Sequence, residues 1–107
     1  MTEKKLQTIL SQTRQGLEQL YGPQLDGIIL YGSQARGDAK SDSDIDVLIL
    51  LKNPFNYFQE SQRISVLIAD ICLKHTVVIS CMFATVQKYQ EYESGLFRNI
   101  RREGVPI

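Results

Sequence analysis

The sequence predicts a small α/β protein in which helices cover a short β-sheet. Apolar residues recur at helical spacing in two long stretches, whereas three shorter apolar runs have the length and composition of β-strands. Along the chain these stretches follow the order helix, strand, turn, strand, helix, strand and two short helices. That order is typical of a short sheet packed against helices.

The composition is that of one ordinary globular domain. The chain has 107 residues, of which 43% are hydrophobic and 22% charged, and its 12 basic and 12 acidic residues give a net charge of zero. The length predicts a single domain over residues 1–107. Because there is no basic excess to displace counterions from DNA, we expect no strong binding to DNA.

The first half of the chain is expected to form a helix and two strands. Residues 3–21 show helical spacing of apolar residues, and Gly22-Pro23 ends this helix. The short apolar run 27–31 is expected to be a buried strand, residues 32–43 a polar turn, and the run 45–51 a second strand.

The second half adds a helix, a strand and two short helices. The helix is expected over about 57–73, and the β-branched run 76–83 is expected to be the third strand. Short helices are expected near 85–93 and 95–103, and the glycine and proline within 104–106 fit a helix stop.

The apolar runs and the cysteines indicate a cytoplasmic protein. The longest wholly apolar run, 47–51, is far too short to span a bilayer, and the first residues lack the apolar run of a signal peptide. Cys72 and Cys81 lie inside apolar segments, so we expect both to be reduced core residues. No association with a membrane is expected.

The stretch "YGSQARGDAKSDSDIDVLIL", residues 31–50, holds the candidate site in its turn and the start of the second strand. Gly32 and Gly37 have the glycine spacing of a phosphate-binding P-loop. Asp38, however, stands where a P-loop carries its lysine. The turn can still bind phosphate through backbone N–H groups, and a short helix after Ser33 would assist.

Two aspartates could hold a cation that replaces the positive charge of the missing P-loop lysine. Asp44 and Asp46 are two apart, so on a strand their carboxylates project to the same side, ~6.6 Å apart along the chain. Two like charges at this separation repel unless a cation neutralises them. Mg²⁺ is the natural candidate because it takes one or two carboxylates and completes its shell with water and phosphate oxygens.

These residues resemble the signature of a known superfamily. The chain has Gly32-Ser33, ten further residues and then Asp44-Ile45-Asp46. This spacing looks like the signature of the DNA polymerase β nucleotidyltransferase superfamily. The whole stretch, together with the closing "SGLFRNIRREGV", resembles the stand-alone minimal nucleotidyltransferases of prokaryotes. The resemblance implies the polymerase β-like fold, a small mixed β-sheet flanked by helices.

The resemblance also implies a role for each residue. Gly32 and Ser33 would bind the triphosphate of ATP or another NTP, and Arg36 is a candidate for a phosphate contact. Asp44 and Asp46 would hold Mg²⁺ and act as the catalytic carboxylates. Two plainer readings remain open, in which Ser33 is a helix N-cap and Arg36 pairs on the surface with a nearby acid, Asp38 or Asp42.

The expected activity is transfer of AMP from ATP to a hydroxyl, most simply on a partner protein. Minimal nucleotidyltransferases are typically paired with a small helical HEPN-type protein, the nucleotidyltransferase acting as antitoxin and the HEPN protein as an RNase toxin. Active members usually carry a third carboxylate on the third strand, whereas 76–83 has no Asp or Glu.

The missing acid leaves two alternatives to this function. The chain could be a catalytically degenerate nucleotide-binding antitoxin that masks its partner by contact. It could instead be the catalytic subunit of a two-chain small-molecule nucleotidyltransferase. A homo-oligomer is compatible with each of these functions.

Overall fold

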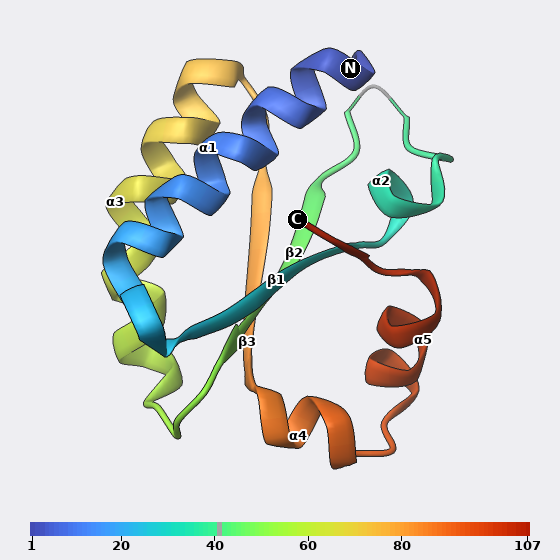
Figure 1. Ribbon diagram of the computed structural model, residues 1–107. Coiled ribbons are helices and arrows are strands. Elements are labelled where there is room, and N and C mark those ends of the chain that lie inside the picture. The colour runs from blue at the N-terminus through green and yellow to red at the C-terminus, as the bar shows by residue number, and fades with distance from the viewer. Residues whose placement is uncertain (41) are drawn as a thin grey trace.

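The structure, a computed structural model, describes residues 1–40 and 42–107, and over these residues the chain forms a four-stranded sheet with helices (Figure 1). The strands are β1 (Leu25–Tyr31), β2 (Ile45–Leu51), β3 (Ile79–Thr85) and β4 (Val105–Pro106). The helices are α1 (Glu3–Tyr21), α2 (Ser33–Arg36), α3 (Tyr57–His75), α4 (Val86–Glu91) and α5 (Gly95–Glu103), with a 3-10 turn over Gly22–Gln24.

The sheet is mixed, as the resemblance implied. Its strand order is β3-β2-β1-β4, with β1 antiparallel to both β2 and β4 and with β2 parallel to β3. Parallel neighbours need a crossover connection, and α3 supplies it between β2 and β3. The most apolar strand, β2, therefore lies inside the sheet, whereas β3 is an edge strand.

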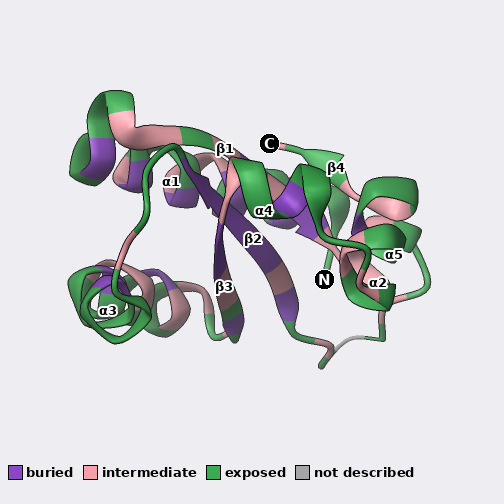
Figure 2. Cartoon of the chain, turned by 90° about the horizontal axis from the view of Figure 1, so that it is seen from below, coloured by how far each residue is buried: buried purple, intermediate pink, exposed green. Residues whose placement is uncertain are grey.

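The two faces of the sheet carry separate clusters of buried side chains. Figure 2 marks the buried residues in purple along the backbone. Successive residues of β2 alternate between the faces, so Val47 and Ile49 pack against the long helices α1 and α3. Leu48 and Leu50 pack on the other face with residues of α4 and α5. By the same alternation Asp46 belongs to the α4–α5 face, at the end of β2 where this cluster stops.

Side-chain caps fix where the long helices begin. The Thr2 hydroxyl accepts a hydrogen bond from the Lys5 N–H at 3.1 Å and starts α1. The Asn56 side chain accepts one from the Gln59 N–H at 3.0 Å and starts α3. The predicted starts of both helices, at residues 3 and 57, are thereby confirmed.

The predicted start of the third strand is wrong by three residues. Thr76 adopts the left-handed conformation, with φ 55°, and closes α3, which extends to His75. The Val77 N–H then bonds the Cys72 carbonyl at 3.1 Å. The β-branched residues before Ile79 therefore form the helix cap and the connection to β3, and not the strand itself.

The fourth strand was not predicted. Gly104 ends α5 as expected, but Val105–Pro106 then pairs with Ile29 and Leu30 of β1. A strand this short leaves no alternating pattern in the sequence. The first strand also begins earlier than expected, at Leu25.

Both cysteines are free, as predicted, but they are partly buried and not fully buried core residues. Cys72 lies on α3 and Cys81 on β3, and both pack against the cluster under α1 and α3. Among the helices that the structure describes, none has both the length and the apolar character needed to cross a membrane.

The central strand should dominate the stability of the fold. Ile49 is 0% exposed, so Ile49→Ala should lower the free energy of unfolding, measured by urea denaturation, by about 2–5 kcal/mol, because it removes buried surface and leaves a cavity. The control Val66→Ala, on α3 and 71% exposed, should change it by less than ~0.5 kcal/mol. Equal losses in the two variants would contradict this assignment of the core.

Candidate active site

A glycine lets the glycine turn and the start of β2 approach each other. Gly32 follows β1 directly and has φ +75°, in the left-handed region. A Cβ at this position would overlap Oδ2 of Asp46 and lie 3.4 Å from its Cγ. Glycine is therefore required twice over, for the backbone conformation and for the space that the Asp46 carboxylate occupies.

The glycine turn leads into the short helix α2. The Gly32 carbonyl accepts the N–H groups of Ala35 and Arg36, both at 3.1 Å, and Gly37 ends the helix at φ +81°. Gly32 is the N-cap and Ser33 is the first helical residue, so the reading of Ser33 as an N-cap is wrong. Gly32 takes the capping place without a side-chain hydrogen bond.

The structure brings the two predicted carboxylates together. Asp46 lies in β2, which has the predicted bounds 45–51, and Asp44 lies just before the strand. Burial raises the pKa of Asp46, the charge of Asp44 raises it further, and the Arg36 guanidinium lowers it. A half-buried carboxylate with a like charge beside it is an environment that a cation would relieve. The donor set therefore fits Mg²⁺.

A row of three side chains crosses the sheet at Asp46. The register pairs Asp46 with Tyr31 of β1 on one side and with Ser80 of β3 on the other. Tyr31 is half-buried, and burial followed by the charge of Asp46 raises its pKa. Ser80 is exposed. In the described part of the chain no group of three or more His, Cys, Asp or Glu residues is placed to hold a metal ion, so the site offers two carboxylates.

Arg36 forms ion pairs on the surface. Its guanidinium lies 3.2 Å from Asp38 and 3.3 Å from Glu103, the last residue of α5, and hydrogen bonds to both raise the pKa of Arg36. The expected pairing with Asp38 is confirmed, and Glu103 is a partner that the sequence did not reveal. A phosphate contact by Arg36 stays a prediction. The Arg36 guanidinium lies near enough to Asp46 to lower the pKa of that carboxyl, so it is close to the candidate site.

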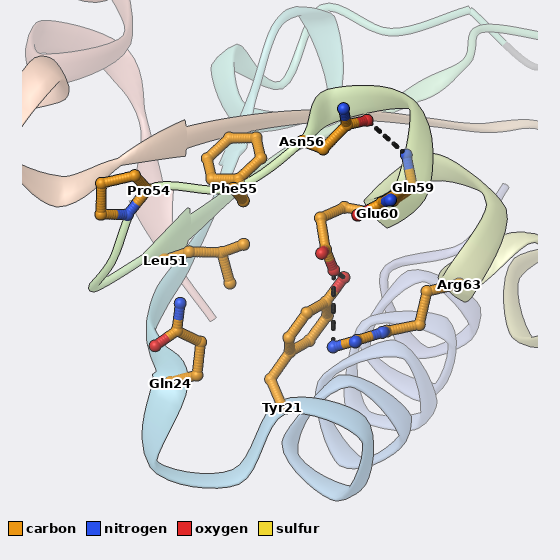
Figure 3. Close-up of a pocket in the computed structure, with 9 residues that line it drawn as sticks. All are labelled: Tyr21, Gln24, Leu51, Pro54, Phe55, Asn56, Gln59, Glu60 and Arg63. Atoms are coloured by element: carbon orange, nitrogen blue, oxygen red, sulfur yellow. Dashed lines mark hydrogen bonds and ion pairs between the residues drawn. The ribbon is translucent and has the colours of Figure 1, made fainter.

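A cavity of about 580 Å³ lies away from the aspartates, at the opposite end of β2 (Figure 3). Leu51 lines it, five residues from Asp46 and so ~16 Å along the strand. There the Tyr21 hydroxyl donates to the Glu60 carboxylate at 2.8 Å, and Arg63 lies 3.6 Å from the same carboxylate. These contacts tie α1 to α3, which gives this end of the molecule a structural role.

The comparisons with known proteins define the class. Residues 10–95 match the family model of the nucleotidyltransferase domain. A protein of Methanocaldococcus jannaschii, MJ0141, carries the name protein adenylyltransferase. It is 36% identical over 72 residues, covering 67% of this chain and 72% of the relative. MJ0604 of the same organism, which carries the same name, is 34% identical, covering 82% and 83%. The chain belongs to the nucleotidyltransferase domain family and is a nucleotidyltransferase, so the predicted superfamily is confirmed.

Solved structures share the fold. A nucleotidyltransferase from Sulfolobus solfataricus aligns with a TM-score of 0.64 and 20% identity, covering 96% of this chain and 82% of that chain. A toxin–antitoxin complex with AMP-PNP aligns at 0.60 and 16%, covering 99% and 72%. A complex of tri-AMPylated Shewanella oneidensis HEPN toxin with MNT antitoxin aligns at 0.56 and 15%, covering 99% and 71%. The predicted polymerase β-like fold is confirmed.

The raised pKa of Asp46 predicts how stability depends on pH. A carboxyl group whose pKa is higher in the folded chain stabilises the fold while protonated and loses that stabilisation as the pH rises through the folded pKa. In metal-free solution near pH 7, Asp46→Asn should therefore raise the free energy of unfolding. The gain should shrink as the pH falls to 3.8, the ordinary value for this group.

Urea denaturation of wild type and variant over this pH range measures the effect. The matched control is Asp26→Asn, an exposed residue of β1, which should stay within ~0.5 kcal/mol of wild type. A metal-free Asp46→Asn variant that is less stable than wild type near pH 7 would show that ionised Asp46 stabilises the fold.

Proposed function

We propose that this nucleotidyltransferase moves AMP from ATP to a hydroxyl group on a partner protein, with Mg²⁺ held by Asp44 and Asp46. The observation that carries the proposal is the contact between Asp46 and Gly32, with Asp44 alongside. This contact puts two carboxylates directly at the edge of a glycine turn. A cation held there would also lie beside any phosphate that the turn binds.

The residues of the site divide the work between them. Backbone N–H groups after Gly32 would bind the β- and γ-phosphates, because the first N–H groups of α2 have no partner within the helix. Asp44 and Asp46 would together hold the cation, and so keep the α-phosphate beside them. When bound, Mg²⁺ supplies charge neutralisation of the triphosphate and of the departing pyrophosphate. Arg36 could exchange Asp38 for a phosphate oxygen, since that ion pair is exposed.

The nature of the acceptor is inferred from relatives. The curated relatives MJ0141 and MJ0604 are named protein adenylyltransferases, and one structural neighbour holds a tri-AMPylated HEPN toxin with its MNT antitoxin. We infer that this chain likewise acts on a small helical HEPN-type partner. An in-line displacement needs a hydroxyl held close to the α-phosphorus, and a docked protein would supply both the hydroxyl and its orientation.

Masking of the partner by contact is the second candidate. The observation that favours it is the register of β3, which places Ser80 and no acid beside Asp46. A site with two carboxylates has fewer groups to orient an attacking hydroxyl. Such a chain could bind a nucleotide and its partner without transferring anything.

Mass spectrometry of a co-expressed helical partner, the product of a neighbouring gene, separates the two functions. Wild type should leave one or more AMP groups on a hydroxyl side chain of the partner. Asp44→Asn and Asp46→Asn should each lower this transfer by at least about 100-fold, because each removes charge stabilisation of the reacting phosphate. The complex itself should survive, since these carboxylates face the nucleotide.

Asp42→Asn is the matched control, since it removes an exposed carboxylate from the same turn and should leave transfer unchanged. A partner that is neutralised but never modified, equally by wild type and by the Asp44 and Asp46 variants, would establish masking and overturn the proposed transfer.

A further inference from the structure

We propose that Ser80 is an internal acceptor, so that with ATP bound and no partner docked the chain transfers AMP to its own Ser80. The inference rests on the proposed function, because it uses the same nucleotide site. It adds a modification site on β3 and a second substrate, the chain itself. The cross-strand row at Asp46 and the direction of in-line attack carry it.

Ser80 lies next to Asp46 on the edge strand β3. The two residues are register partners in the parallel pair of β2 and β3, whose strands lie ~4.8 Å apart. Two residues further along each strand, Leu48 and Met82 both pack into the cluster beneath α4 and α5. Ser80 and Asp46 therefore project from the same face, and Ser80 is exposed where that cluster ends.

The direction of attack points to Ser80. The Asp46 carboxylate leans toward β1, where Oδ2 fills the space beside Gly32. With the pyrophosphate leaving on the side of the glycine turn, an in-line nucleophile must come from the opposite side of the α-phosphorus. In the strand order β3-β2-β1-β4 that opposite side is β3. Because β3 is the edge strand of the sheet, no further strand among the described residues covers Ser80.

The chemical step balances with ATP as the only co-substrate. A bond forms between Ser80 Oγ and the α-phosphorus, and the bond from that phosphorus to the oxygen bridging to the β-phosphate breaks. Pyrophosphate leaves with the electron pair, and the serine proton passes to water. The product is a phosphodiester that links AMP to Ser80. A docked partner would present its own hydroxyl from the same side and so compete with Ser80.

Tyr31 is the other hydroxyl in the row and is the weaker acceptor. It belongs to β1, on the side where the pyrophosphate leaves. It is half-buried, and burial raises the pKa of its hydroxyl, which makes the phenolate harder to form. Tyr31→Phe therefore distinguishes the two hydroxyls and should leave the modification of Ser80 unchanged.

The test is intact mass and peptide mapping of the purified chain after incubation with Mg²⁺ and ATP. We expect one added AMP, mapped to Ser80, in wild type and in Tyr31→Phe. Ser80→Ala should lose the adduct and Ser80→Thr, which keeps a hydroxyl, should retain it. Ser61→Ala, an exposed serine of α3, is the control that should behave as wild type.

A parallel calorimetric titration uses an ATP analogue whose α–β bridge is carbon. If wild type binds the analogue but carries no adduct after incubation with Mg²⁺ and ATP, the internal acceptor is overturned and the proposed nucleotide site still stands. An adduct that maps elsewhere, or that survives in Ser80→Ala, would equally overturn it. A chain that does not bind the analogue with Mg²⁺ would overturn the proposed function and this inference together.

Discussion

The contact between Gly32 and the Asp46 carboxylate is the constraint on which the site depends. It exists because antiparallel pairing of β1 with β2 sets Tyr31 opposite Asp46, so the residue that follows β1 must pass over that carboxylate. A side chain there would push the two segments apart. Burial at this contact and the charge of Asp44 raise the pKa of Asp46, an environment that a bound cation would relieve.

The strand that carries Asp46 explains how this arrangement is held in place. From Val47 to Leu51 every residue of β2 is buried, and the two faces of the strand pack into separate clusters. Packing of this kind resists local displacement, so the unfavourable proximity of two carboxylates is tolerated at the end of a rigid element. Stability generated along β2 thus offsets an electrostatic strain at its first residues, a common arrangement at functional sites.

The parts that could be predicted from sequence depend on local patterns. The spacing of two indicated that Asp44 and Asp46 lie near each other, and the charge of Asp44 does act on Asp46. The turn motif identified Gly32, which lies against the Asp46 carboxylate. What escaped prediction depends on tertiary register: Glu103 meets Arg36 across 67 residues, and Ser80 meets Asp46 through a parallel crossover. The cap at Thr76 was missed for a local reason, since a β-branched residue rarely adopts φ 55° and the sequence there favours a strand.

Calorimetric titration with Mg²⁺ and ATP of wild type, Gly32→Ala and Gly22→Ala tests the central contact most directly. Both glycines have positive φ, but only at Gly32 would a Cβ meet Asp46, while nothing lies within 4 Å of the position at Gly22. Gly32→Ala should weaken binding at least about 10-fold, ~1.4 kcal/mol, and Gly22→Ala should bind as wild type. Equal affinity in Gly32→Ala and wild type would contradict a nucleotide site built on this contact.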